Sequence, residues 1–314
     1  MLRNLIPEFL DVLDAADPEA AYHAYFDRHT ALLSAYWRNY VLDPDSIHAT
    51  EVIGATVRAD RADLKSVLES VDLAQVAQEA LARTEDLLEV DCPTDLVLMV
   101  GVGAANAGEL VVDGKGTAFV CVEHFTGKTN PTTWGMGLNP ELLSVWIAHE
   151  IAHCVRYTSP ESTSDMRRLV AEAGGYYDYW ETGRRAPLRE LLINEGLAVH
   201  ASQAVAPGFA AADYFGYPRR QYTRMRELES FLRRAVAPDL DKSGLGLRLR
   251  YLSGGVGPAA RLVQGKVVPE RCGYYLGHRM AEALVQQQGI TRALRAPATA
   301  FDVADRDAEG IRTA

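Results

Sequence analysis

An otherwise apolar helix that contains two histidines and a glutamate constrains this chain most. Asn139-Pro140-Glu141 predicts the start of the helix, because Asn is a good N-cap residue and Pro suits the first turn. The helix should end before Pro160, and it is apolar nearly all round, which predicts a central, buried position. Its His149-Glu150-Ile151-Ala152-His153 would be costly to bury alone, and a divalent cation is a suitable partner.

The spacing of these residues suits a metal. Residues i and i+4 lie one turn apart on the same helix face, so the imidazoles of His149 and His153 can converge on one ion. Glu150 lies beside them, where its carboxylate can take a proton from a metal-bound water. The pattern predicts His149 and His153 as metal ligands and Glu150 as a catalytic general base. The alternative is a pair of hydrogen-bonded core histidines.

A third ligand is predicted in a second apolar helix, from Pro187 to about Val205. Asn194-Glu195-Gly196-Leu197-Ala198 places the Glu195 carboxylate there, far enough from His153 for a loop and a returning helix. Two histidines and one glutamate leave the fourth zinc position open for water, as a catalytic site requires. We therefore expect one Zn²⁺ per chain, with Glu195 as its third ligand. The alternative for Glu195 is a partly exposed helix glutamate.

The rest of the chain predicts an α+β fold that is predominantly helical, with a small mixed sheet. We expect a helical N-terminal region over residues 1–90, a sheet with the histidine-bearing helix over 91–160, and a helical lobe with the third ligand over 161–314. Another long helix is predicted over 274–288, and the small, polar tail 296–314 is expected to be frayed. Three strands are predicted, over residues 96–100, 109–112 and 117–125.

Composition limits the partners and the location. The net charge of −10 and the pI near 5.3 disfavour a nucleic acid, which would be repelled. No apolar run approaches about 18 residues, so no membrane span is expected, and the N-terminus does not resemble a signal peptide. The four cysteines lack paired close spacing. They are typical of reduced, buried thiols, and we expect a cytoplasmic protein.

These motifs resemble those of the gluzincin metallopeptidases, in which an HExxH sequence is followed by a glutamate ligand. The wider pattern is similar to a bacterial family of predicted zinc-dependent proteases, through Val122-Glu123-His124-Phe125, Glu195-Gly196-Leu197-Ala198 and Gly273-Tyr274-Tyr275-Leu276-Gly277-His278-Arg279. The resemblance extends over about residues 95–290. It implies a zincin-like fold, with the HExxH helix at the floor of a cleft between a sheet-bearing lobe and a helical lobe. The metzincin type is excluded, because no His follows a Gly shortly after His153.

The resemblance also implies further roles. Gluzincins use a Tyr or His to stabilise the oxyanion, which favours Tyr275 and His278 as additional catalytic residues; core packing is the alternative for both. Strand 117–125 is a candidate edge strand for peptide binding. Glu123 on that strand is a candidate for binding a substrate amine, with a solvent-facing position as the default.

One position departs from the gluzincin pattern. Val199 stands where related enzymes place an acid that orients the first histidine. Asp165, Glu172 and Glu190 are the candidates for that orienting role.

Three hypotheses on function follow. The first is a zinc-dependent peptide-bond hydrolase acting on a peptide or protein substrate. The second is a regulatory metal-binding protein that recognises one partner and cuts rarely or never. The third is a helical interaction protein whose histidines are ordinary core residues. Glu150 favours the first, since a binding site has no use for a general base. Cleavage specificity, the choice between endo- and exopeptidase, and the oligomeric state stay open.

Overall fold

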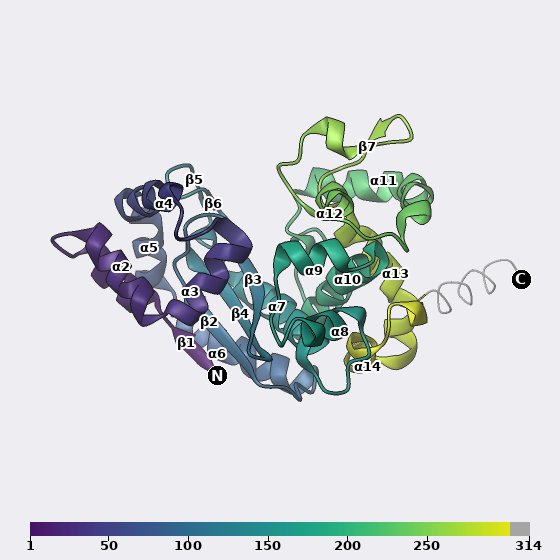
Figure 1. The fold of residues 1–314 in the computed structure, drawn as a ribbon, viewed down its shortest axis with the longest axis horizontal. Coiled ribbons are helices and arrows are strands. Elements are labelled where there is room, and N and C mark those ends of the chain that lie inside the picture. The colour runs from purple at the N-terminus through teal and green to yellow at the C-terminus, as the bar shows by residue number, and fades with distance from the viewer. Residues whose placement is uncertain (302–314) are drawn as a thin grey trace, which may run out of the picture.

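The computed structural model describes residues 1–301 and has a helical majority with a small mixed sheet, as predicted. The N-terminal half lies on one side of the molecule and the C-terminal half on the other, with helix α7 between them (Figure 1). The N-terminal half contains β1 (Leu2–Asn4), α1 (Ile6–Leu13), α2 (Pro18–Arg28), α3 (Thr30–Tyr36), the π-helical segment η1 (Trp37–Val41), α4 (Ile47–Arg58), α5 (Ala62–Ser70), α6 (Leu73–Leu87), β2 (Thr94–Met99), β3 (Ala107–Val112), β4 (Lys115–Cys121), η2 (Val122–His124), β5 (Thr129–Asn130) and β6 (Gly135–Met136).

The C-terminal half is built from helices around one long pair. Its elements are η3 (Pro140–Leu142), α7 (Leu143–Thr158), α8 (Asp165–Glu172), α9 (Tyr179–Arg185), α10 (Leu188–Val205), η4 (Asp213–Phe215), α11 (Arg219–Val236), η5 (Ala237–Asp239), α12 (Leu245–Leu252), η6 (Pro258–Arg261), β7 (Leu262–Val263), β8 (Lys266–Val267), α13 (Cys272–Gln288) and α14 (Ile290–Arg295). The predicted long helices correspond to α7, α10 and α13. Most of the predicted frayed tail lies outside the described residues.

The main sheet has the strand order β1-β2-β4-β3. Strands β1, β2 and β4 are parallel, and β3 pairs antiparallel with β4. Asp113 and Gly114, with φ of 52° and 75°, form the two-residue turn between β3 and β4, as expected for a hairpin turn that needs two left-handed residues. Because β2 and β4 are internal, the two edge strands of this sheet are β1 and β3.

Residues 1–90 form mostly helices, and β1 adds a short parallel strand beside β2. Two expectations about residues 117–125 are wrong. Strand 117–125 is not the edge strand, since β4 lies between β2 and β3. The strand also ends at Cys121, and residues 122–124 turn into the short helix η2. The segment boundaries at residues 90 and 160 stay predictions.

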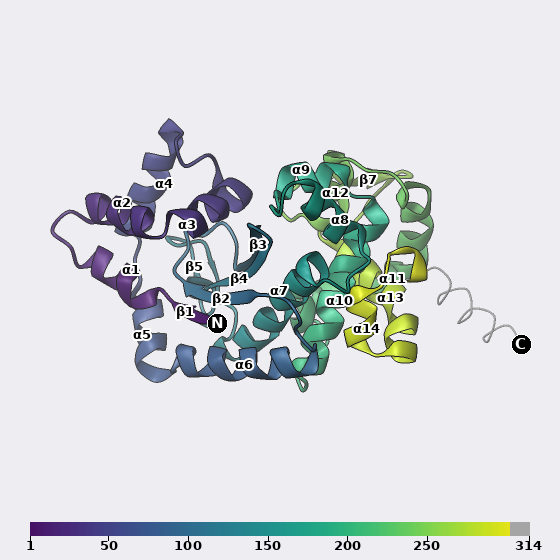
Figure 2. The ribbon, with the colours of Figure 1, turned by 60° about the horizontal axis from the view of Figure 1, so that its bottom comes forward.

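Helix α7 is central, as its apolar sequence predicts. Every residue from Leu143 to Tyr157 is buried. Asn139 caps the turn that precedes the helix by accepting a hydrogen bond from Glu141 N–H at 3.1 Å, and Ser159 ends it. The sheet and α6 cover one side of α7, and α10 lies along another (Figure 2).

Helices α10 and α13 approach each other very closely at two glycines. A Cβ atom on Gly277 would lie 1.7 Å from the carbonyl oxygen of Leu192, and one on Gly196 would lie 2.0 Å from the carbonyl carbon of Gly277. Both neighbours are backbone atoms, which cannot rotate away. The contact therefore fixes which face of α13 points at α10 and at Glu195.

None of the helices in residues 1–301 combines the length and apolarity that a membrane crossing requires. All four cysteines are buried and free, as their spacing predicts.

Candidate metal centre

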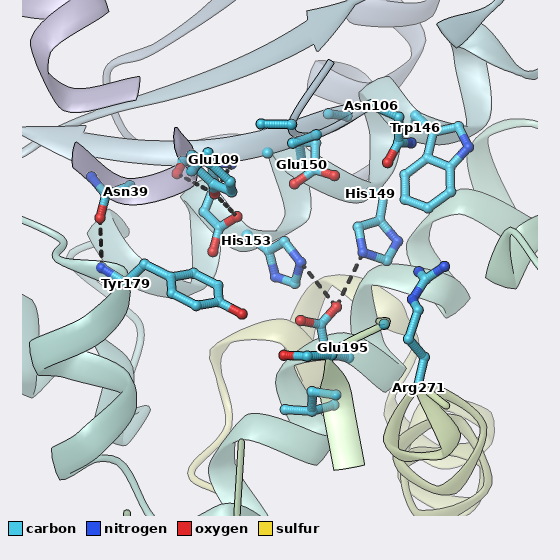
Figure 3. A pocket seen from close by; sticks show the side chains of 18 of the residues that line it. Asn39, Asn106, Glu109, Trp146, His149, Glu150, His153, Tyr179, Glu195 and Arg271 are labelled. Carbon is cyan, nitrogen blue, oxygen red and sulfur yellow. Dashed lines mark hydrogen bonds and ion pairs between the residues drawn. The ribbon is translucent and has the colours of Figure 1, made fainter. Parts of the chain in front are cut away.

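Two helices bring the three predicted metal ligands together (Figure 3). His149 and His153 project from one face of α7, and their rings are 4.9 Å apart. Glu195 on α10 faces both: its Oε2 lies 3.3 Å from His149 Nε2 and 3.5 Å from His153 Nε2. One donor atom from each residue lies within 4.8 Å of the others. The donor atoms thus converge on a single point from two positions one turn apart on α7 and from one position on α10.

The electrostatics of this group reflect contact between two buried histidines and a partly buried glutamate. Burial lowers the pKa of His149. Burial alone would also lower the pKa of His153, but the nearby carboxylates of Glu109 and Glu195 raise it to about 10. Burial alone would raise the pKa of Glu195, and the two histidines lower it below its usual value. In the absence of a metal, a proton on His153 therefore balances the charge of Glu195.

The donor set fits a divalent ion of the zinc type. Two imidazole nitrogens and one carboxylate oxygen are a frequent catalytic zinc set, and they leave a fourth position open. The ion would replace the proton of His153 as the positive charge between these three groups. The histidine Nδ1 atoms are buried and have no hydrogen-bond partner in the part of the chain that the structure describes. Zinc-binding histidines usually have such a partner, which can be a carboxylate, a carbonyl or a water, and no protein group of residues 1–301 supplies it here.

None of the three candidates for orienting the first histidine reaches it. Glu190 receives two hydrogen bonds of 2.9 Å from the Arg156 guanidinium in a fully buried pair. Asp165 and Glu172 both pair with Arg168 on the surface. The prediction that one of them holds His149 is wrong, because other cations already engage them.

Glu150 lies next to the ligands in a second acidic group. It forms, with Glu109 and His153, another set of donor atoms within 4.8 Å of one another. Burial raises the pKa of Glu150 well above the usual carboxylate range, and Glu109 and Glu195 add to the increase. A carboxyl group that gains and loses a proton at higher pH is suited to general acid–base work.

Glu109 on β3 is held by a buried network that the sequence analysis missed. Tyr157 donates to Glu109 Oε1 at 2.9 Å and accepts from Asn194 Nδ2 at 2.9 Å. The Tyr40 hydroxyl lies 2.9 Å from Glu109 Oε2. This network connects β3, α7 and α10 directly beside Glu195. A lone carboxylate in the apolar run Glu109-Leu110-Val111-Val112 was the available signal.

A cavity of about 490 Å³ opens over these residues. Both halves of the molecule line it, from η1 and the segment before β3 on one side to α9, α12 and α13 on the other. His149, Glu150, His153 and Glu195 all face it. Its size is in the range of small-ligand sites, about 300–1,000 Å³.

The structure does not bring Tyr275 and His278 to this cavity. Tyr275 donates to Glu229 Oε2 at 2.6 Å on the far side of α13. His278 stacks on His200 at 4.0 Å and donates from Nε2 to Gln203 at 3.1 Å. Both serve in packing and hydrogen bonding, which was the stated alternative.

Tyr274 and Arg271 line the cavity in their place. The ring of Tyr274 stacks beside His149 at 6.1 Å with an interplanar angle of 17°. Burial raises the pKa of Tyr274 well above 10, and Glu195 adds to the increase, so its hydroxyl stays protonated. The sequence predicted a catalytic role for neither residue, although Tyr274 directly precedes Tyr275, for which it did.

Glu123 is neither solvent-facing nor at the cavity wall. It is 1% exposed, and its carboxylate accepts from Gly101 N–H at 3.0 Å and Gly103 N–H at 3.4 Å. These bonds hold the segment that leads to β3. The default expectation of a solvent-facing strand residue is wrong, because the strand ends before residue 123.

Comparison with known protein families identifies a match in the C-terminal half of the chain. Residues 176–302 match a family model described as "Predicted Zn-dependent protease". The matched part includes Glu195 and the cavity-lining residues of α13, but it begins after His149, Glu150 and His153. The chain matches no curated protein and no solved structure.

Proposed function

We propose that this chain is a zinc-dependent peptide-bond hydrolase of the gluzincin type. His149, His153 and Glu195 would hold one Zn²⁺ per chain, and α7 would form the floor of a zincin-like cleft. The observation that carries the proposal is the convergence of three donor atoms from α7 and α10 within 4.8 Å at a cavity wall. The match of residues 176–302 to predicted zinc-dependent proteases supports it independently.

Each residue then has a distinct role. Zinc, when bound, supplies Lewis acidity that activates water and polarises a carbonyl. Glu150 takes the proton from the attacking water and returns it to the leaving amine nitrogen. Its position beside both histidines and its raised pKa support this role.

Tyr274 takes the role that the sequence analysis gave to Tyr275 and His278. A hydroxyl donor opposite the ligands would stabilise the negative charge that develops on the carbonyl oxygen. Tyr274 faces the cavity beside His149 and keeps its proton at any physiological pH. Peptides are the proposed substrates, and the four free, buried cysteines support a cytoplasmic location.

The experiment is a peptide-library digest read by mass spectrometry, combined with metal analysis. Purified, metal-replete protein should contain about one zinc per chain and should lose hydrolysis on chelation. Glu150→Gln should keep its zinc and lose at least about 100-fold in turnover, the usual contribution of a general base. Glu85→Gln, at an exposed position on α6, is the matched control and should behave as the wild type.

Three outcomes contradict the proposal. Unchanged turnover in Glu150→Gln would remove the general base. A zinc content below about 0.2 per chain after metal-replete expression would remove the metal site itself. Zinc binding without cleavage of any peptide would favour the regulatory metal-binding alternative.

A further inference from the structure

The edge of β3 beside the metal centre is open only over a short segment. Strand β3 pairs with β4 alone, so alternate residues direct their backbone groups away from the sheet. At Glu109 these groups are already bonded: the Tyr40 hydroxyl accepts from Glu109 N–H at 3.1 Å and lies 2.9 Å from its carbonyl oxygen. At Val111 the carbonyl accepts from Tyr177 N–H at 3.0 Å.

Ala107 is two residues before Glu109 and faces the same edge. None of the residues in the described chain hydrogen-bonds its outward backbone groups, and it lines the cavity together with Ala105 and Asn106. An extended peptide can therefore add to β3 at this point and is blocked one step further on. The edge suits a short peptide and not a long segment of a folded protein.

The direction of β3 determines on which side of the cavity the C-terminus of such a peptide lies. In Figure 3, Asn106 lies on the side of Trp146 and His149, and Glu109 lies on the side of His153. A peptide that pairs antiparallel to β3 runs the opposite way, so its C-terminal end points toward the His149 side of the cavity. The blocked positions, Glu109 and Val111, then limit its N-terminal side.

Arg271 stands on the His149 side and forms no ion pair with an acid among residues 1–301. Burial alone would lower its pKa, but the Tyr274 hydroxyl and Glu195 are near enough to raise it. Its guanidinium lies 4.4 Å from the ring centre of Tyr274 and 5.7 Å from that of Tyr217. Its Nη1 and the Trp146 ring both approach the Cβ position of Gly216. It also lines the cavity.

The other cavity arginine is already engaged. Arg248 lies 3.3 Å over the Tyr179 ring and donates to the Tyr179 carbonyl at 2.6 Å and the Tyr177 hydroxyl at 3.0 Å. Among the acids of the cavity wall, Glu195 contacts the histidines and Glu109 contacts the tyrosines. Glu150 also lines the cavity and forms no ion pair with Arg271. Arg271 is thus the cavity cation available for an anionic ligand. A guanidinium binds a carboxylate or a phosphate with two parallel hydrogen bonds, and a peptide lying along β3 offers the carboxylate of its C-terminus.

We infer that Arg271 binds the free α-carboxylate of a short peptide, so that the site cleaves one of the last two peptide bonds before the C-terminus. The inference rests on the proposed hydrolase function and specifies its substrate class. Hydrolysis breaks the peptide C–N bond. The OH group of the water molecule joins the acyl carbon, and the second proton of the water goes to the nitrogen, which leaves as an amine.

The test compares matched peptides with the metal-replete protein. N-acetylated tripeptides to pentapeptides are offered with either a free C-terminal carboxylate or a carboxamide, and the products are read by mass spectrometry. The wild type should cleave the free acids with a kcat/KM about 30-fold or more above that of the amides, the size expected for a hydrogen-bonded ion pair. Arg271→Gln should reduce this ratio to within about 3-fold. Arg292→Gln, at an exposed position on α14, is the matched control and should keep the full ratio.

Binding provides a second readout. Glu150→Gln protein is titrated calorimetrically with the same peptides, and the acid should bind about 30-fold more tightly than the amide unless Arg271 is also replaced. Equal cleavage and equal binding of acids and amides by protein with intact Arg271 would overturn the inference and leave the proposed hydrolase standing. If zinc-loaded protein cleaves no peptide, the hydrolase proposal fails, and the calorimetric comparison still decides the role of Arg271. Thermal unfolding of Arg271→Gln checks that the variant is folded.

Discussion

Helices α7 and α13 both line the cavity, yet the sequence was informative about one and misleading about the other. On α7, the residues selected from the sequence, His149 and His153, face the same point in the structure. On α13, Tyr275 and His278 face away, and Tyr274 faces the cavity instead. Spacing within one helix determines which of its side chains share a face. It does not determine the direction of that face in the molecule.

The close contact between α10 and α13 determines that direction. Gly277 faces α10, because the Cβ position on Gly277 points at the backbone of Leu192. At 100° per residue, Tyr274 lies about 60° from Gly277 around the helix, and Tyr275 lies about 160° from it. Tyr274 is therefore directed toward α10 and Glu195, and Tyr275 toward Glu229 on α11. Both glycines are visible in the sequence, but their contact is not.

The largest effect is expected from filling that contact. Gly277→Ala places a Cβ atom 1.7 Å from a backbone oxygen, so the two helices must separate, and we expect a loss of more than about 3 kcal/mol in unfolding free energy. Gly246→Ala, in helix α12 with open space around its Cβ position, should be neutral or stabilising by up to about 1 kcal/mol. Denaturant unfolding measures both. A Gly277→Ala protein as stable as the wild type would show that the glycine contact does not orient α13.

The second-largest effect is on kcat, and it should distinguish Tyr274, which faces the cavity, from Tyr275, which faces α11. Tyr274→Phe should lower kcat by about 100-fold with a folded, zinc-loaded protein, because a donor to the oxyanion contributes about that much. Tyr275→Phe removes only the hydrogen bond to Glu229 and should change kcat by less than about 3-fold while costing about 1 kcal/mol of stability. Steady-state kinetics on one cleaved peptide decide the comparison. The reverse order of effects would return the catalytic role to Tyr275.

The smallest effect is on the pH dependence of the unfolding free energy, and it concerns His278 of α13, which stacks on His200. Burial, together with His200 and Arg279, lowers the pKa of His278 to about 2. Above pH 6.5 this histidine is neutral in both the folded and the unfolded chain. As the pH falls below 6.5, only the unfolded chain gains the proton, so the unfolding free energy should fall by about 1.4 kcal/mol per pH unit from this residue.

Urea unfolding of zinc-free protein at pH 6.5, 5.5 and 4.5 measures that slope. His278→Asn should show a slope about 1.4 kcal/mol per pH unit shallower than the wild type. Equal slopes in the two proteins would mean that His278 takes up a proton in the folded state, contrary to its buried stacking on His200.

The sequence alone determined the local parts of this protein: the helices α7, α10 and α13, and the Asn139 cap that precedes α7. It also selected the three groups that meet at the metal centre, because two histidines one turn apart and a glutamate in an apolar helix need a common partner. The side chains of distant segments followed no such local rule. Glu109, Tyr274 and Arg271 reach the cavity through the order of strands in the sheet and the glycine contact of α10 with α13. Those relations join residues far apart along the chain, so backbone packing in three dimensions decided them, and residue spacing could not.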